Sequence, residues 1–264
     1  MLDDNPNKPI RVVVFAGGPT LEWGVKLFLV RLEENPEIEM LACICQSKDQ
    51  SFSAVIRDLW KRRGFLAFPL MLNQATRIIW SYIKSDIRIV NKKIAEISDR
   101  IHFVPDIHAQ SVLQQVRRLS PDLGLIYGSP ILKPTLFEIP IHGTLGIHHG
   151  MAPKYRGKKT TFWEVYAGEP AAGVIIQKVN AGLDTGEIVK QGAVPIGSRT
   201  LGAVWRDLHA LGLHLYLQAI LEVKHGTANY SPQQGPKSKL CRDPKLVDII
   251  SLWGRIIDRK LRIY

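Results

Sequence analysis

The chain has 264 residues, of which 45% are hydrophobic, and a formal net charge of +11. This length and composition are enough for the core of one large domain, or of one domain with an appendage, and they exclude global disorder. The three cysteines, Cys43, Cys45 and Cys241, form neither a disulfide framework nor the ligand spacing of a zinc site. We therefore expect a reducing compartment and no metal.

The positive charge is concentrated in three stretches, 61–63, 154–159 and the tail after residue 237. Such charge suits nucleic acid, anionic lipid headgroups or a phosphorylated substrate. Because the sequence has no RNA-binding motif and no interleaving of aromatic and basic residues, we expect no nucleic-acid partner. No secretory signal opens the chain and no long uncharged apolar run occurs, so we expect a cytoplasmic protein.

Strand patterns alternate with helix patterns along the chain, beginning with the buried run 10–15 and the glycine turn that follows it. The opening strand–helix–strand order predicts a right-handed parallel crossover. We therefore predict an α/β fold with a Rossmann-like, mostly parallel sheet and helices on both faces. Strands are expected at 10–15, 39–45, 101–104, 123–127, 144–148, 173–179 and 187–195, and helices at 21–32, 111–119, 159–167, 201–224 and 244–262.

The composition becomes more polar at Gly226, which divides the chain into a main domain, 1–225, and a short basic extension, 226–264. The extension ends in an amphipathic helix with basic residues beside its apolar face. Two interpretations of this helix stay open: it docks on the body or at a homodimer contact, or it binds the anionic inner face of a membrane. Packing and membrane contact also stay open for the basic, aromatic segment 60–82.

The motif with the clearest chemistry is His148-His149-Gly150, which ends an apolar strand, followed much later by Asp184 in Gly-Leu-Asp-Thr-Gly. A histidine can hold a proton near neutral pH, and an aspartate from a later loop can orient it. Ligands bind beyond the carboxyl ends of parallel strands, where Gly17 and Tyr127 also lie. Taken singly, His148 could cap a strand and Asp184 could form a turn, so the combination matters.

The region from Leu123 to Ile188 resembles the folate-dependent formyltransferase family, whose members formylate glycinamide ribotide, methionyl-tRNA or amino sugars. The matching pieces are 126–132, 143–157, 173–176 and 181–188, in the family's order and spacing, and the resemblance extends over roughly 10–225. It implies the formyltransferase fold, 10-formyltetrahydrofolate as the cofactor, and an enzyme that transfers a formyl group to an amine.

The resemblance also implies roles for individual residues. His148 and Asp184 match the catalytic histidine and aspartate. The residues expected at the cofactor are Tyr127, Gly128, Ser129, Pro130, Ile131, Leu132, Gly182 and Leu183. Those expected at the acceptor substrate are Gly17, Gly18, Lys154, Tyr155, Arg156, Lys158, Lys159 and Thr160, several of them as a clamp for a phosphate.

One position departs from the family pattern. The third catalytic residue of the family is an asparagine two places before the histidine, and this chain has Gly146 there. The asparagine would supply a second donor to the developing oxyanion, and losing one such donor costs a factor on the order of 10²–10³ in rate. Three explanations stay open: another donor replaces it (His149, Thr160 or a backbone N–H), the chemistry is slow or different, or the protein binds the cofactor without turnover.

The acceptor is inferred from the same resemblance. Gly150 stands where many members have serine, which is more similar to the sugar-formylating branch than to the tRNA branch. The residues after Gly226 are too few for the large C-terminal domain of the tRNA enzymes, which disfavours methionyl-tRNA. We expect a small amine acceptor, phosphorylated or nucleotide-linked, with an amino sugar favoured. The alternatives are hydrolysis of the formyl cofactor and a catalytically impaired protein that binds folate or a nucleotide sugar.

Overall fold

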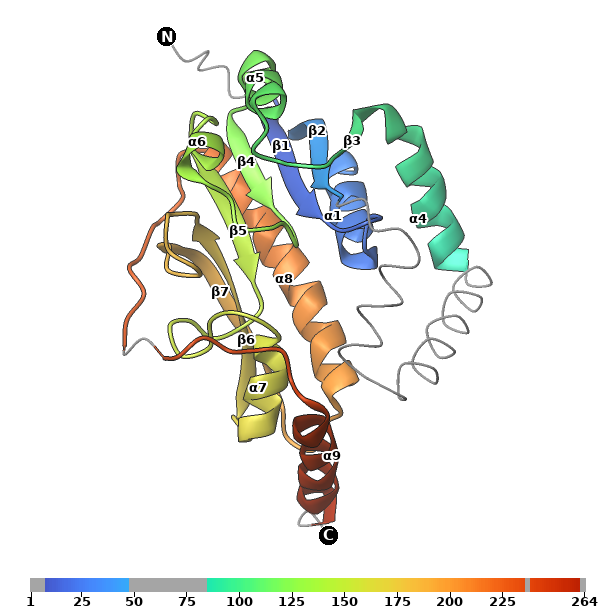
Figure 1. Cartoon of the computed structure of the whole chain (residues 1–264), viewed down its shortest axis with the longest axis vertical. Coiled ribbons are helices and arrows are strands. Elements are labelled where there is room, and N and C mark those ends of the chain that lie inside the picture. Colours follow the sequence, from blue (N-terminus) through green and yellow to red (C-terminus); the bar gives the residue numbers. More distant parts are fainter. Residues whose placement is uncertain (1–7, 48–84, 236–237, 262–264) are drawn as a thin grey trace.

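The computed structural model describes residues 8–47, 85–235 and 238–261, so the predicted segment 60–82 lies outside the described residues. Within these ranges seven strands form one sheet in the order β3-β2-β1-β4-β5-β6-β7 (Figure 1). The strands are β1 (Ile10–Gly17), β2 (Ile38–Gln46), β3 (Ile101–Val104), β4 (Leu123–Ile126), β5 (Thr144–His148), β6 (Ala171–Lys178) and β7 (Ile188–Pro195).

The first five strands are parallel, whereas β6 runs antiparallel to β5 and β7 antiparallel to β6. This confirms the predicted Rossmann-like, mostly parallel sheet. The helices are α1 (Trp23–Glu33), α4 (Ser85–Glu96), α5 (Gln110–Leu119), α6 (Pro134–Phe137), α7 (Thr160–Ala167), α8 (Leu201–Lys224) and α9 (Leu246–Leu261), with a 3₁₀ turn, η2 (Ser98–Arg100).

Helices cover both faces of the sheet because its strands are apolar on both sides. Alternate residues of β1 belong to two different cores: Val12 and Val14 pack with α1 and α8, while Val13 and Phe15 pack with α5 and α6. Successive strand side chains point to opposite faces, which produces this division. The two faces are consequently different environments along every central strand.

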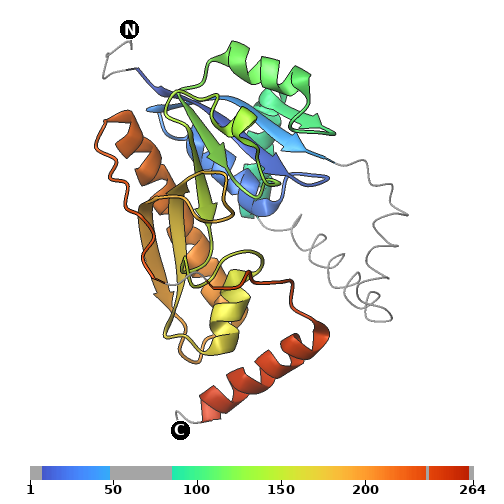
Figure 2. The same ribbon diagram turned by 60° about the vertical axis from the view of Figure 1, so that its left-hand side comes forward.

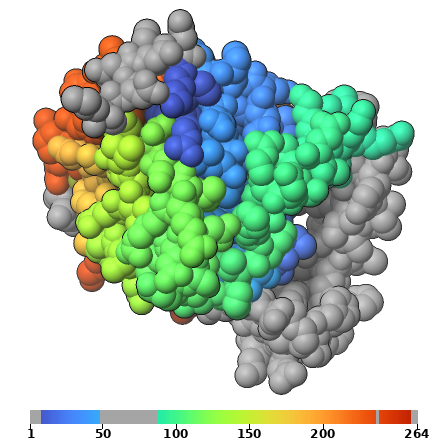
Figure 3. Space-filling view, turned by 90° about the horizontal axis from the view of Figure 1, so that it is seen from above, coloured from blue at the N-terminus to red at the C-terminus, as the bar shows by residue number. Residues whose placement is uncertain are grey.

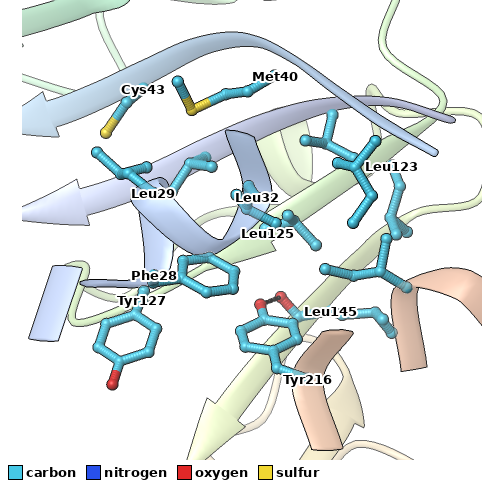
Figure 4. Packing of buried hydrophobic residues seen from close by; sticks show 14 of the residues in the cluster. Phe28, Leu29, Leu32, Met40, Cys43, Leu123, Leu125, Tyr127, Leu145 and Tyr216 are labelled. Atoms are coloured by element: carbon cyan, nitrogen blue, oxygen red, sulfur yellow. Dashed lines mark hydrogen bonds between the residues drawn. The ribbon is translucent and has the colours of Figure 1, made fainter. Parts of the chain in front are cut away.

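Tyr216 of α8 holds together the two strands that lead to the site. Its ring is fully buried and stacks on Phe28 at 4.7 Å between centroids. Its hydroxyl accepts a hydrogen bond from Ile126 N at 2.9 Å. It donates one to Leu145 O at 2.8 Å, and Tyr216 and Leu145 are both labelled in Figure 4. A buried hydroxyl needs such partners, and here they connect β4 to β5.

The strand order reverses between β1 and β4, since β2 and β3 lie on one side of this pair and β5 on the other. A crevice for ligands is expected at the carboxyl ends of the strands on either side of such a reversal. Figure 3 looks onto the opposite end of the molecule, where residues 8–47 and the green segment around α5 form a continuous surface. The site is therefore expected at the end of the molecule that faces away from the viewer in Figure 3, where the parallel strands end.

The extension after α8 returns along β7, where Ser231 bridges Ile188, and α9 then packs beneath α7 (Figures 1 and 2). Leu252 and Ile256 of α9 are buried in the core that α7 and α8 share. Arg259 donates to Val165 O at 2.9 Å. The helix therefore docks on the body, while five of its large apolar side chains are more than half exposed: Leu246, Val247, Ile250, Trp253 and Ile257.

No helix in the described part of the chain has the length and apolar character needed to cross a membrane.

Candidate active site

His148 is the last residue of β5, and its side chain is buried. Its Nε2 lies 2.8 Å from Tyr155 O, and its Nδ1 lies 3.4 Å from Asp184 Oδ1. A carbonyl oxygen can only accept a hydrogen bond, so Nε2 carries a proton in this arrangement. The Asp184 carboxylate oxygen on the other side of the ring is also an acceptor, so both nitrogens of His148 face acceptors.

Asp184 reaches His148 from the loop between β6 and β7, in the left-handed conformation with φ +50°. This conformation suits aspartate better than most residues. Its Oδ2 accepts a hydrogen bond from Gly157 N at 2.9 Å, so one carboxylate contacts both the histidine and the loop that follows it. The two predicted catalytic residues are therefore adjacent in space, and their catalytic roles stay predictions.

The loop after His148 is packed so closely that two of its glycines have no room for a side chain. A Cβ added at Gly150 would lie 2.7 Å from His148 Nε2, and one added at Gly157 would lie 2.7 Å from Cys241 O. Contacts this short would force the histidine ring or the backbone to move. A side chain at Gly150 would thus shift the His148 ring or Thr160.

Glu164 of α7 is a site residue that the sequence analysis missed. Its carboxylate is buried, and Oε1 accepts hydrogen bonds from Met151 N at 2.8 Å and Gly173 N at 3.1 Å. Its Oε2 has no hydrogen-bond partner among the described residues. Burial raises the pKa of Glu164 to about 7. The sequence feature that could have identified Glu164 is that it is a single acidic residue inside an otherwise uncharged helix, Thr-Thr-Phe-Trp-Glu-Val-Tyr-Ala.

His149 lies on the opposite face of the sheet from His148. Its ring packs on Trp205 at 4.7 Å and lies parallel to His209 at 5.9 Å between centroids. Burial of the ring, with smaller contributions from His209 and His148, lowers its pKa to about 3. A neutral histidine on the α8 side cannot donate to an oxygen beside His148. Thr160 is the other side chain considered as a donor, and its hydroxyl donates a hydrogen bond to His149 O instead.

A pocket of about 270 Å³ opens where the strand order reverses. Gly17 and Gly18 line one side of it, and the 128–130 turn lines the other. A Cβ on Gly17 would lie 2.9 Å from Pro130 Cδ, so the glycine lets the two loops meet. The structure therefore brings together residues predicted at the substrate and residues predicted at the cofactor.

Two of the predicted cofactor residues are in the core. Tyr127 and Leu132 are each 6% exposed, and the Tyr127 hydroxyl lies 2.6 Å from His209 Nε2. Their side chains support the loop from within, whereas Ile131 between them is 72% exposed. Gly182 and Leu183 directly precede Asp184 in the loop, and Asp184 is the residue of that loop that contacts His148.

Three of the basic residues predicted as a phosphate clamp already have protein partners. Lys154 Nζ lies 2.7 Å from Glu169, and Lys158 Nζ lies 3.3 Å from Asp243. Arg156 donates two hydrogen bonds to Leu183 O, at 2.7 and 3.0 Å, and so holds the aspartate loop. The Tyr155 hydroxyl donates to Glu169 Oε1 at 2.7 Å, and Lys159 precedes α7 in a left-handed conformation. Exposed ion pairs are weak, so the two lysines can still exchange partners.

The extension contributes to the site through contacts that the sequence analysis did not predict. Cys241 N donates to Arg156 O at 2.7 Å, and Lys158 N donates to Cys241 O at 3.0 Å, which pairs the extension with the histidine loop. Gln233 Nε2 donates to Asp184 O at 3.1 Å and to Gly186 O at 2.9 Å. A domain boundary at residue 225 stays a prediction. Residues beyond it hold both site loops in place.

Comparison with known families matches residues 89–220 to the formyl transferase model, which is half of the chain. The chain belongs to the formyl transferase family. The match contains both His148 and Asp184, and the α/β fold of the formyl transferases agrees with the sheet described above.

Individual formyl transferases resemble different parts of this chain. The methionyl-tRNA formyltransferase of Pelotomaculum thermopropionicum is 35% identical over 122 residues, which are 46% of this chain and 39% of that protein. The sugar N-formyltransferase from Shewanella sp FDAARGOS_354 superposes with a TM-score of 0.59 at 12% identity, over 92% of this chain and 86% of that one. HypX from Aquifex aeolicus, in complex with tetrahydrofolic acid, gives 0.54 at 13% identity, over 89% and 30%. The chain spans well under two thirds of the curated relative.

Proposed function

We propose that this protein transfers a formyl group from 10-formyltetrahydrofolate to an amine. The observation that supports this most strongly is the 3.4 Å approach of Asp184 Oδ1 to His148 Nδ1 at the carboxyl end of β5. Membership of the formyl transferase family supports the reaction class, and the tetrahydrofolate complex of HypX supports the type of cofactor.

The residues present fit a folate-type ligand. The glycine-lined pocket offers a surface that a Cβ at Gly17 would fill, and the 128–131 turn adds a polar backbone and an exposed isoleucine. Flat ligands with a polar edge need this combination of apolar and backbone surface. When bound, the cofactor supplies the formyl group.

His148 acts as the hydrogen-bond donor at the formyl oxygen. Its Nε2–H donates to Tyr155 O in the structure, and the same N–H would donate to the formyl oxygen when the cofactor is bound. Asp184 keeps the ring oriented. It takes up a proton from the attacking amine directly or through water, and this proton would pass to the tetrahydrofolate nitrogen that departs when its bond to the formyl carbon breaks. Glu164 keeps Met151 N, and with it the start of the histidine loop, against β6.

The acceptor that we propose is a small phosphorylated or nucleotide-linked amine, with an amino sugar favoured. The backbone of Gly17 and Gly18 and the exchangeable ion pairs of Lys154 and Lys158 support an anionic acceptor. Because relatives include both sugar and methionyl-tRNA formyltransferases, the tRNA is a necessary arm of the assay.

The experiment incubates the whole protein with 10-formyltetrahydrofolate and, separately, with nucleotide-linked amino sugars, glycinamide ribotide or methionyl-tRNA. Tetrahydrofolate and the formylated acceptor are measured together. Formyl transfer to a sugar supports the proposal in full. Formate release without an acceptor supports the hydrolase alternative, and tight cofactor binding without turnover supports the binding-protein alternative.

We further propose a cytoplasmic protein whose α9 makes peripheral contact with an anionic membrane at its inner face. Five exposed apolar side chains on this helix, together with the net charge of +11, support this contact. Co-sedimentation with phosphatidylserine vesicles tests it, and Trp253→Ser should weaken it. Light scattering at the same concentrations tests the alternative occupant of this face, a second copy of the chain.

A further inference from the structure

The site has one side-chain donor where the proposed reaction needs two. His148 is a donor toward the reacting oxygen, and Gly146, two residues earlier on the same face of β5, has no side chain. A Cβ built at Gly146 meets Val179 Cγ2 at 3.3 Å and Ile126 Cβ at 3.8 Å, both apolar. The face beside His148 would be apolar at this point unless another strand supplied a polar group.

Gln177 of β6 supplies a polar group at this position. It pairs directly with Gly146 across the antiparallel β5–β6 ladder, while Ile175 pairs with His148. Side chains of directly paired residues point to the same face, about 4.5–5.5 Å apart at Cβ. Gln177 therefore lies on the His148 face, and Val179, two residues further on, lies against Gly146 on that face.

The orientation of the Gln177 amide is defined by its hydrogen bonds. Its Oε1 accepts from Gly186 N at 3.0 Å and from Gln233 Nε2 at 3.2 Å. Two donors at one end identify that end as the oxygen. No described residue accepts a hydrogen bond from the Nε2 end, so its two N–H groups are left for a further acceptor, and the residue is only 7% exposed.

The same two contacts link Gln177 to the rest of the site. Gly186 follows Asp184 by two residues, and Gln233 also donates to Asp184 O. The amide is therefore held by the loop that positions the catalytic aspartate and by the extension. A buried side chain restrained in this way is preorganised, which is what an oxyanion donor requires.

We propose that Gln177 is a catalytic residue, the second donor to the formyl oxygen, which replaces from β6 the side-chain amide that Gly146 lacks on β5. This inference rests on the proposed formyl transfer. Neither His149 nor Thr160 can take the role, because His149 faces α8 and the Thr160 hydroxyl is bonded to His149 O.

The test uses Gln177→Glu, because glutamate keeps an oxygen for Gly186 N and Gln233 Nε2 and loses only the N–H donor. Steady-state kinetics are measured from pH 5 to 8 as the ratio to wild type. We expect kcat to fall on the order of 10²–10³-fold at pH 8 with little change in the KM of the cofactor. The ratio should recover as pH falls, because a protonated glutamate can donate again.

Gln191→Glu is the matched control, since Gln191 is an exposed glutamine of β7 on the same sheet. It should leave kcat unchanged and so account for the added charge. If Gln177→Glu retains wild-type kcat across the pH range, Gln177 only anchors the aspartate loop and the inference is wrong. If the wild-type protein transfers no formyl group to any acceptor, the proposed function fails, and this inference fails with it.

Discussion

His148 and His149 are neighbours in the chain and lie in two different regions of the molecule. His148 faces a carboxylate and a backbone carbonyl, both acceptors, at the carboxyl end of the sheet. His149 faces Trp205 and His209 on the α8 side, where burial holds its pKa at about 3. The same type of side chain is therefore a hydrogen-bond donor in one region and a neutral aromatic ring in the other. The direction of a strand residue, rather than its identity, decides its chemistry.

The largest effect is expected from removing the histidine on the polar side. His148→Asn should lower kcat about 10³-fold or more, because the shorter asparagine amide corresponds to Nδ1 and leaves no N–H at the position of Nε2, the donor to the reacting oxygen. The measurement is formyl transfer at saturating cofactor. His142→Asn is the control, since His142 is exposed and precedes the same strand. Retained turnover in His148→Asn would show that His148 is not the donor to the reacting oxygen.

Asp184→Asn should have the next largest effect, a loss on the order of 10²-fold in kcat. Asparagine also tolerates the left-handed conformation, and its oxygen can still accept from Gly157 N, so the loop should keep its shape. Thermal denaturation checks that the fold is intact. A variant with unchanged kcat would mean that the carboxylate only supports the loop.

His149→Phe should change stability and leave kcat within about threefold. Its folded pKa lies below the ordinary value of 6.5, so between pH 3 and 6.5 the unfolded chain binds more protons. Wild-type stability should therefore fall as pH decreases through this range, by up to about 1.4 kcal/mol per pH unit from this group. Urea denaturation at several pH values should show that the free energy of unfolding of the phenylalanine variant depends less on pH than that of the wild type. A large loss of kcat would contradict the separation of the two faces.

Glu164→Gln should change the pH dependence in the opposite sense. The folded pKa of about 7 lies above the ordinary value of 4.5, so between these values the native state binds more protons. The wild-type protein should thus lose stability from this group as pH rises from 4.5 to 7, at most about 1.4 kcal/mol per unit. The glutamine variant should lack this loss in the same urea experiment. Equal pH profiles would mean that Glu164 titrates normally.

Gly146→Asn should also have only a small effect, less than a tenfold gain in kcat. If Gln177 already supplies the second donor, an added amide is redundant, and the new Cβ must displace Val179 slightly from its 3.3 Å contact. Kinetics of the purified variant provide the measurement. A gain of 10² or more would show that the donor was never replaced.

The strands and most of the site motif could be predicted from the sequence because their signals are local. Apolar runs of the right length marked β1, β4 and β5, and the spacing from His148 to Asp184 matched the family. Strand alternation alone would also put His149 on the opposite face from His148. Glu164 was missed because its partners, Met151 N and Gly173 N, belong to a loop and a strand outside its helix.

The sequence by itself determined the α/β class, the order of the elements and the histidine–aspartate pair, since hydrophobic periodicity and motif spacing are properties of adjacent residues. Only the tertiary structure decided that β6 runs antiparallel to β5, in the register that pairs Gln177 with Gly146. It likewise decided that Gln233 and Cys241 of the extension hold the site loops. Register and long-range hydrogen bonds depend on how distant segments pack together, and a short stretch of sequence does not encode that packing.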